Sequence, residues 1–364
     1  MPDRRSLSEL PKAHLHVHLE GAMRPDTLDE LCARYRIDRP VDTRGRRFTD
    51  FGGFNALYWA ATHCLRTRED LARLVMEVAE DAAREGVRWI EPAFDAERYS
   101  TLRAEGPFRL FEDQTEGWRF VFEAAEAAER ATGVGIGFMS AIDRTRALDS
   151  AMARARVTAA LVRSGEHLIE SGMPDFEGRH PALVAVGLHG NEQGHPPEPF
   201  DPAFRVALEG TGLLCTPHAG EIAPAPGGGP RSVAGALDAL GADRILHGVL
   251  AVEEPALVAR LARAGVCLDV CPSSNVLLSV VPSLREHPLP QLLEAGVACS
   301  LGSDDPLLFG PSLLQEYTLC GSEMELGDVD LARLARSSFE HSAAPAEVKA
   351  RALADIESWL GANG

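Results

Sequence analysis

A (β/α)8 barrel of the α/β class is the fold that the sequence predicts. Eight apolar segments of strand length alternate with longer amphipathic segments, which predicts parallel strands joined by helical crossovers. Residue types that bind metals or move protons recur at the carboxyl ends of the first, fifth, sixth and eighth apolar segments. A barrel brings the carboxyl ends of its strands together, whereas an open doubly wound sheet spreads them. No G-x-G-x-x-G pattern follows the first strand, which further disfavours a nucleotide-binding open sheet.

The predicted elements follow in a regular order. The strands span residues 13–19, 87–94, 134–142, 182–188, 213–218, 244–248, 265–270 and 297–302. Helical spacing of apolar residues, closed by a glycine that suits a C-cap, marks 71–86, 150–172, 255–265 and 289–296. The aromatic segment 47–70 is either an extra helix packed on the barrel or a lid over its mouth. With further helices at the C-terminus, one barrel domain, 1–364, accounts for the chain.

The composition indicates an acidic protein, which fits a small-molecule enzyme as well as many other kinds of protein. The chain has 364 residues and a formal net charge of -18. Such a charge disfavours nucleic acids and anionic membranes, which bind basic surfaces. No apolar run approaches the ~20 residues of a membrane span, and the seven cysteines are scattered and odd in number. We expect a cytoplasmic protein without a disulfide framework, and the sequence leaves its oligomeric state open.

Histidines and an aspartate at three strand ends predict a metal site. His16 and His18 lie two residues apart in the first strand, so their side chains face the same way. His218 ends the fifth strand and Asp304 follows the eighth. Three neutral imidazoles and one carboxylate suit Zn²⁺, which binds nitrogen and oxygen ligands at low coordination number.

The lysine content indicates how many metals this site holds. Barrel hydrolases with two metals need a bridging ligand, often a carbamylated lysine on a central strand. The chain has only Lys12 and Lys349, and neither falls in a predicted central strand. We therefore predict one zinc per chain.

Three more ionisable residues adjoin the predicted ligands. Glu221 comes three residues after His218, so it can reach the cavity without binding the metal. A carboxyl group in a dry site can stay protonated and act as a general acid. His247 ends the sixth strand, where it can orient an attacking water or take its proton. Asp305 follows the metal-binding carboxylate and would face the substrate.

These segments together resemble the adenosine deaminase family, in its adenosine/adenine deaminase branch. The resemblance covers nearly the whole chain and is carried by HLHVHLEG (14–21), VGLHGNE (186–192), TPHAGE (216–221), ILHG (245–248), CPSSN (271–275) and SDDP (303–306). It implies hydrolysis at C6 of a 6-aminopurine, with ammonia as the leaving group. CPSSN is a family signature to which we first assign a structural role.

The resemblance also implies a role for each site residue. The implied zinc ligands are His16, His18, His218 and Asp304. Glu221 would protonate the purine at N1, and His247 would act on the attacking water. Asp305 would contact N7, and the backbone N–H of Gly190 would reach N3.

One position departs from the adenosine-specific pattern. The adenosine-specific members commonly have the sequence HLDG, and its aspartate contacts the ribose 5′-hydroxyl. This chain has HLEG at the same place. Glu20 is one methylene longer, so we expect it to govern what is tolerated at N9. The substrate is then adenosine or a related adenine nucleoside, free adenine, or a 5′-modified adenine nucleoside such as aminodeoxyfutalosine. Binding the carboxylate of aminodeoxyfutalosine would require a basic side chain, and Arg66, Arg68 or Arg98 could supply it.

Two other classes of function fit part of this pattern. A purine-binding protein without activity should have lost some of the machinery, whereas every predicted metal and proton-transfer position is filled here. A zinc hydrolase of an amide or lactone would not need the purine contacts implied at Gly190 and Asp305. We therefore favour a zinc-dependent deaminase.

Overall fold

The computed structural model describes residues 5–100, 109–222 and 227–361, and parallel strands in these ranges form two sheets. The first sheet runs in the order β1 (Lys12–His18), β2 (Val87–Phe94), β4 (Phe138–Asp143), β7 (Leu183–His189) and β8 (Leu214–Cys215), with β3 (Gly135–Ile136) beside β2. The second contains β9 (His218–Ala219), β10 (Arg244–His247), β11 (Cys267–Val270) and β12 (Ala298–Leu301). Neighbours in sequence are neighbours in space, as a barrel requires.

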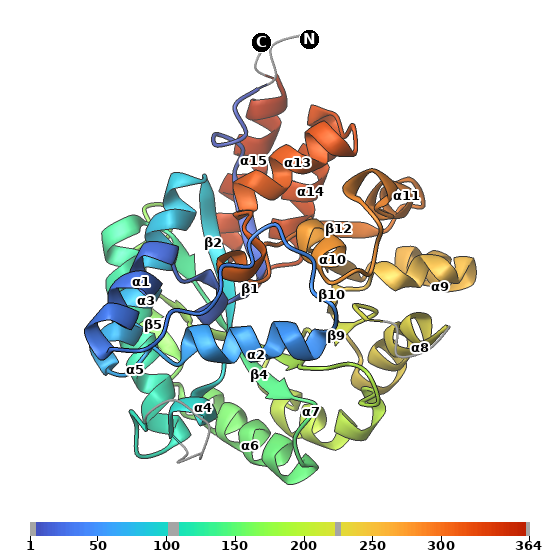
Figure 1. Ribbon diagram of the computed structural model, residues 1–364. Coiled ribbons are helices and arrows are strands. Elements are labelled where there is room, and N and C mark those ends of the chain that lie inside the picture. Colours follow the sequence, from blue (N-terminus) through green and yellow to red (C-terminus); the bar gives the residue numbers. More distant parts are fainter. Residues whose placement is uncertain (1–4, 101–108, 223–226, 362–364) are drawn as a thin grey trace.

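The two sheets meet on both sides. On one side, β8 and β9 belong to a single stretch of chain that is interrupted at Thr216 and Pro217, and proline has no N–H to donate to a ladder. On the other side, the Asp304 N–H donates to the His16 carbonyl at 3.1 Å, and the His18 N–H donates to the Asp304 carbonyl at 3.0 Å. The predicted barrel is confirmed, and Figure 1 shows its strands inside a surround of helices.

The helices of the described residues lie mainly between successive strands and cover the outside of the barrel (Figure 1). They are α1 (Pro25–Tyr35), α2 (Phe51–Thr62), α3 (Arg68–Arg84), α4 (Ala96–Ser100), α5 (Gln114–Thr132), α6 (Leu148–Ser164), α7 (Asp201–Leu208), α8 (Gly228–Gly235), α9 (Pro255–Ala264), α10 (Pro272–Leu277), α11 (Leu289–Glu294), α12 (Pro306–Phe309), α13 (Leu313–Glu323), α14 (Asp328–Glu340) and α15 (Ala346–Gly361). The helices predicted at 71–86, 255–265 and 289–296 correspond to α3, α9 and α11.

The helix predicted at 150–172 ends earlier than expected. Gly165, with φ of 76°, is the left-handed C-cap of α6, and the chain then forms β5 (Leu168–Glu170). This strand pairs antiparallel with β6 (Arg179–Pro181). The apolar residues at 168 and 169 therefore belong to a hairpin, and the prediction that Gly172 closes the helix was wrong.

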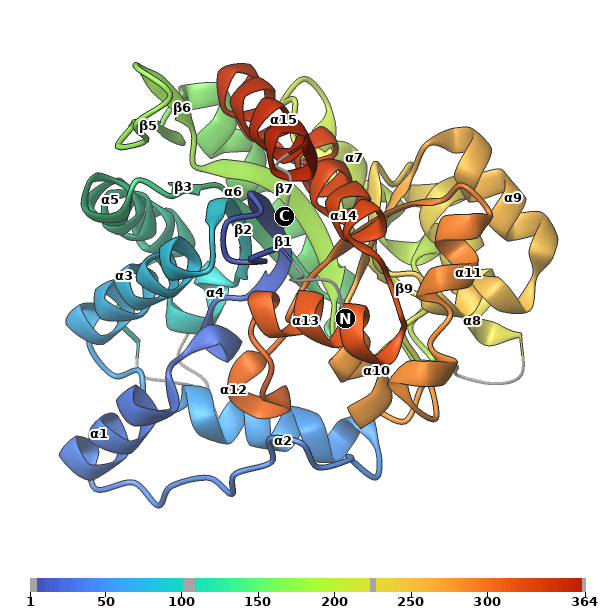
Figure 2. The ribbon, with the colours of Figure 1, turned by 90° about the horizontal axis from the view of Figure 1, so that it is seen from above.

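An extra helix occupies the segment between the first two strands. The N-cap of α2 is Asp50, whose carboxylate accepts the Gly53 N–H at 2.8 Å. The Phe54 ring stacks on Phe309 at 5.2 Å and meets Phe48 edge-on at 5.5 Å. Figure 2 shows α2 lying across one end of the barrel. Segment 47–70 therefore contains a helix that packs on the barrel and also lies across one end of it, as both interpretations expect.

The C-terminal helices cover another part of the barrel. α14 packs against β1 and β12, and α15 packs on α14. The hydroxyl of Ser338 on α14 accepts the N–H of Ala13 at 3.0 Å. These contacts confirm the extra helices expected after the last strand. None of the helices described is long and apolar enough to cross a membrane.

Candidate active site

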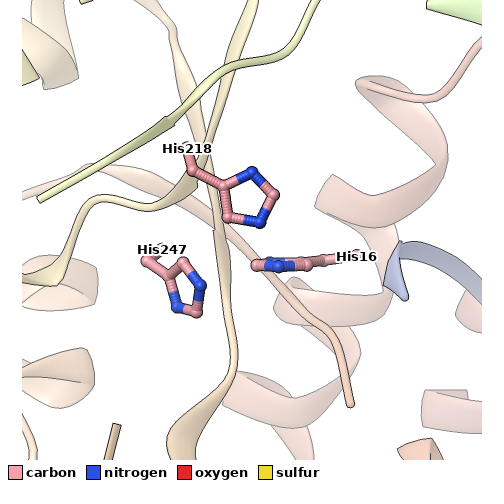
Figure 3. Close-up of side chains that lie close together, drawn as sticks. All are labelled: His16, His218 and His247. Carbon is pink, nitrogen blue, oxygen red and sulfur yellow. The ribbon is translucent and has the colours of Figure 1, made fainter. Parts of the chain in front are cut away.

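Strand ends from distant parts of the chain bring histidine rings together. The buried rings of His16, His218 and His247 lie with centroids 4.5 to 5.4 Å apart and face one another in Figure 3. The His18 ring stacks against His218 at 5.3 Å. Burial, and then the neighbouring imidazoles, lower the pKa of His16, His218 and His247 well below the usual value. These three rings are therefore neutral at pH 7.

Hydrogen bonds decide which nitrogen of two rings faces the centre of the cluster. His16 Nδ1 donates to the Asp269 carbonyl at 2.8 Å, and His218 Nδ1 donates to the Leu188 carbonyl at 3.0 Å. A neutral ring carries one proton, so Nε2 of each presents a lone pair, and Nε2 of His16 is buried without a hydrogen-bond partner. Imidazoles oriented by a backbone carbonyl are typical metal ligands.

The carboxylate of Asp304 completes this donor set. Its Oδ1 lies 3.4 Å from His18 Nε2 and 3.8 Å from His16 Nε2. Two donors bound at ~2.0 Å in a tetrahedral site stand about 3.3 Å apart. Asp304 has φ of 58°, a strained conformation for a residue with a side chain. Histidine and aspartate side chains at this place could therefore hold a metal ion.

The predicted first strand began at residue 13, whereas in the structure Lys12 is the first residue of β1. Its Nζ donates to the carbonyls of Leu7 and Leu10, each at 2.6 Å. It lies at the opposite end of β1 from His16 and His18, so it cannot bridge metals at the cluster. The reason for predicting a single metal is unaffected.

Glu221 is held over the cluster by a second carboxylate. Glu192 accepts three successive backbone N–H groups at 2.7 to 3.0 Å, from Gly220, Glu221 and Ile222. The Glu221 side chain is buried, and its Oε1 lies 3.5 Å from His247 Nε2. Burial, and then the charges of Asp304 and Glu192, raise the pKa of Glu221 well above its usual value. A carboxyl group whose surroundings favour the protonated form therefore lies beside the predicted metal ligands.

Asp305 and Gly190 line a cavity next to this cluster. Asp305 is buried, and its Oδ1 has no hydrogen-bond partner in the described structure. Burial, and then Asp304, raise the pKa of Asp305 well above its usual value. Gly190 follows β7 with φ of 91°, a conformation that glycine adopts without strain. Both predicted substrate contacts therefore adjoin the predicted metal ligands.

The far part of the same cavity is formed by Glu20 and aromatic side chains. The Glu20 carboxylate accepts the Tyr99 hydroxyl at 2.8 Å and the Tyr58 hydroxyl at 3.2 Å. Arg98 also lines the cavity, with its guanidinium 4.0 Å over the Trp59 ring. Tyr58 and Trp59 both come from α2, so this helix shapes the cavity as well as covering the barrel.

Comparison with known proteins decides the family. The family model described as "Adenosine deaminase" matches residues 11–359.

The chain belongs to the adenosine deaminase family.

A relative from Streptomyces coelicolor, described as "Putative adenosine/adenine deaminase", is 40% identical over 368 residues, covering 98% of each chain. An aminodeoxyfutalosine deaminase from Streptomyces avermitilis is 35% identical, over 98% of this chain and 93% of the relative. The solved structure of adenine deaminase from Arthrobacter aurescens superimposes with a TM-score of 0.81 at 30% identity, over 97% of this chain and 99% of that one. This adenosine deaminase family member is thus a metal-dependent hydrolytic deaminase with the predicted fold.

The candidate active site also contains residues that the sequence did not single out. Asn275 hydrogen-bonds His247, Glu192 holds the Glu221 loop, and Tyr58 and Tyr99 hold Glu20. Asn275 and Glu192 lie in the CPSSN and VGLHGNE segments, which could have indicated them. No sequence pattern indicated the tyrosines, because α2 and α4 bring them to Glu20 only in the folded barrel.

The three arginines considered for a substrate carboxylate have different positions. Arg68 donates to the Leu110 carbonyl and pairs with Glu116 at the surface. Arg66 stacks on the Tyr35 ring at 5.3 Å and does not line the cavity. Arg98 alone of the three lines the cavity.

Proposed function

We propose that this protein hydrolyses the exocyclic amine of a 6-aminopurine, with free adenine as the preferred substrate and one Zn²⁺ per chain. Glu20 is the observation that carries the choice of adenine. Its side chain is buried, and two tyrosine hydroxyls bind it in the part of the cavity where, if the family resemblance holds, the N9 substituent would lie. A carboxylate there can accept the N9–H of the free base. Since it is a methylene longer than aspartate, it also leaves less room for a sugar.

Zinc is the metal that the donor set favours. The proposed ligands are the Nε2 atoms of His16, His18 and His218 and a carboxylate oxygen of Asp304, a mixture of neutral nitrogen and charged oxygen that suits Zn²⁺. Bound zinc would lower the pKa of an attacking water to about 7.

The chain's own residues then bind the purine and move its protons. Glu221, held protonated by its surroundings, donates to N1 while C6 is attacked, and this lets the ring nitrogen carry the electron pair. N7 is a hydrogen-bond acceptor, so the protonated carboxyl of Asp305 is the form that can bind it. The N–H of Gly190 donates to N3. His247, whose Nε2 lies 3.5 Å from Glu221 Oε1, would orient the attacking water.

A specific observation favours a second candidate, an adenine nucleoside with a carboxylate at its 5′ end. Arg98 is buried, and in the described structure its Nε has no hydrogen-bond partner. Its Nη2 donates to the Thr62 hydroxyl, and the guanidinium stacks on Trp59. A buried guanidinium that lines the cavity with an unbonded Nε would donate to such an anion, because hydrogen bonds between a guanidinium and a carboxylate are strong.

A substrate panel tests the two candidates. The zinc-loaded protein is given adenine, adenosine and a 5′-carboxylated adenosine, and loss of the adenine absorbance band is followed together with ammonia release. We expect kcat/KM for adenine to exceed that for adenosine by roughly 10²-fold. Equal or faster turnover of adenosine would reject the preference for adenine. Fastest turnover of the carboxylated nucleoside would select the second candidate, and no turnover of any aminopurine would reject both.

A further inference from the structure

We propose that Asn275 and His287 are positioning residues that keep the proton of His247 on Nε2, so that His247 donates a hydrogen bond into the active site and does not bind the metal. The inference concerns hydrogen-bond direction, and only its kinetic consequence rests on the proposed function. It follows from a series of hydrogen bonds that begins at a backbone N–H. A backbone N–H can only donate, so the donor and acceptor of each later bond in the series can be assigned.

The chain of contacts begins at the N-terminus of α11. The N–H of Leu289, the first residue of this helix, donates to His287 Nδ1 at 3.1 Å. The first N–H groups of a helix lack partners within the helix, so this bond satisfies one of them. Burial lowers the pKa of His287 to about 3, and its ring is neutral at pH 7. Because Nδ1 accepts, the single proton of His287 lies on Nε2.

Asn275 transmits this direction to His247. His287 Nε2 lies 3.1 Å from Asn275 Oδ1, so the N–H donates to the amide oxygen. The amide nitrogen then faces His247, with Nδ2 at 3.2 Å from Nδ1 of that ring. An amide N–H donates, so His247 Nδ1 is an acceptor and carries no proton. Asn275 is fully buried in α10, and the two histidines leave its amide one orientation that satisfies both bonds.

Because Nδ1 of His247 accepts a hydrogen bond, the proton of this ring lies on Nε2. This atom is buried and has no hydrogen-bond partner in the described structure, although Glu221 Oε1 lies 3.5 Å away and Asp304 Oδ2 3.8 Å away. The backbone supports a set orientation, since His247 has φ of 65° and Gly248 has φ of 70°. Left-handed conformations of residues with side chains are strained and persist where the surrounding structure holds them.

The three rings in Figure 3 thus differ in which nitrogen carries the proton, because their hydrogen-bond partners differ. His16 and His218 donate from Nδ1 to backbone carbonyls and offer Nε2 lone pairs to a cation. His247 accepts at Nδ1 and offers an N–H. All three nitrogens are close enough to share an ion, yet only two have the lone pair that a metal needs. His247 then orients the attacking water by donating to its oxygen, and Glu221 is left as the residue that exchanges protons with the substrate.

Nitrogen NMR of the zinc-loaded protein tests the tautomer directly. Protein labelled with ¹⁵N-histidine is compared with His247→Gln, which identifies the signals of His247. We expect the wild-type ring to show a protonated Nε2 and an unprotonated Nδ1. In Asn275→Asp the carboxylate can only accept, so the proton should move to Nδ1. The accompanying loss of kcat should be roughly 10²-fold with a smaller change in KM, because the substrate contacts are intact.

Two further variants distinguish loss of the hydrogen bond to His247 from a general disturbance of the fold. Ser274→Ala changes the neighbouring buried residue of the same helix, whose hydroxyl has no hydrogen-bond partner in the described structure, and should leave kcat within about twofold. His287→Gln retains an N–H donor for Asn275 and should keep more activity than His287→Leu.

A wild-type ring with its proton on Nδ1 would overturn the inference, and so would an unchanged tautomer in Asn275→Asp. If Asn275→Asp does not fold, the tautomer of His247 in the wild-type protein decides the question by itself. Absence of aminopurine turnover in a wild-type protein that shows the expected tautomer would instead reject the proposed function.

Discussion

Gly21 faces the Asp305 carboxylate so closely that a Cβ at position 21 would overlap it. Gly21 lies in the 3-10 turn after β1, and Asp305 directly follows the proposed ligand Asp304. The missing side chain is therefore what allows the Asp305 carboxyl to stay beside the cavity.

Gly21→Ala should displace Asp305 and weaken the contact with the purine. We expect kcat/KM to fall roughly 10- to 10²-fold, as for a misplaced positioning contact, while metal content stays unchanged. Steady-state kinetics and elemental analysis measure the two effects. Gly327→Ala is the matched control, because a Cβ there meets its nearest neighbour, Asp330, at 3.9 Å. Wild-type kinetics in Gly21→Ala would show that Asp305 does not bind substrate.

Metal analysis should find one zinc per chain in wild-type protein. His218→Ala removes a ligand whose Nδ1 is anchored to the Leu188 carbonyl, so zinc content and activity should fall together. A chelator should inactivate the wild type, and added zinc should restore it. Two metals per chain, or full zinc occupancy in His218→Ala, would contradict the proposed ligand set.

Glu221→Gln should abolish turnover while leaving zinc bound, since the residue supplies a proton and not a ligand. Loss of a general acid typically costs ~10²–10⁴ in rate. Glutamine preserves the size of the side chain, and the backbone N–H bonds to Glu192 do not depend on it. Near-normal kcat in this variant would exclude Glu221 as the acid.

Glu20→Asp should move the substrate preference towards adenosine. The shorter carboxylate frees space at the N9 end and withdraws from Tyr58 and Tyr99. We expect the ratio of kcat/KM for adenosine over adenine to rise by roughly 10-fold or more, with little change in kcat for adenine. An unchanged ratio would place specificity in α2 or in the loop after Gly190.

The pH dependence of stability should contain a contribution from Glu316. This buried carboxyl group accepts the Ser273 N–H at 3.3 Å, and burial raises its pKa from 4.5 to about 8. Between these values the folded protein holds a proton that the unfolded chain has released. Its stabilising contribution is therefore complete below pH 4.5 and is lost as the pH rises towards 8.

In Glu316→Gln the free energy of unfolding should decline less steeply between pH 5 and 8. Denaturant titrations at several pH values measure the slope. Glu323→Gln, which changes a partly exposed residue of the same helix, should keep the wild-type slope. Parallel profiles for Glu316→Gln and wild type would show that Glu316 is not protonated in the folded state.

Much of the barrel and its chemistry could be predicted because both depend on short-range patterns. The apolar segments indicate which residues are buried, and the i, i+2 spacing of His16 and His18 indicates that both side chains lie on one face of a strand. Residues at strand ends meet in any barrel, so His218, His247 and Asp304 could be assembled before the structure was known. The end of α6 was misjudged because two glycines suited a C-cap, and only the pairing of β5 with β6 shows that Gly165 was the one used.

The supporting residues could not be predicted because their partners are distant in sequence. Glu192 contacts backbone N–H groups 28 to 30 residues away, and Tyr99 reaches Glu20 across 79 residues. No periodicity reports such a contact. The direction of each hydrogen bond around Asn275 depends on the backbone at Leu289, which the pattern CPSSN does not contain.

The backbone of Asp304 lies in the junction that joins the two sheets, while its side chain belongs to the proposed metal site. An ion that binds only the folded barrel stabilises it in proportion to the logarithm of the free ion concentration. Occupancy would therefore strengthen the junction as well as enable catalysis. The thermal midpoint should rise with free zinc, and in a zinc-starved cell the protein should be cleared faster by proteolysis. Its abundance would then follow metal supply even at constant synthesis.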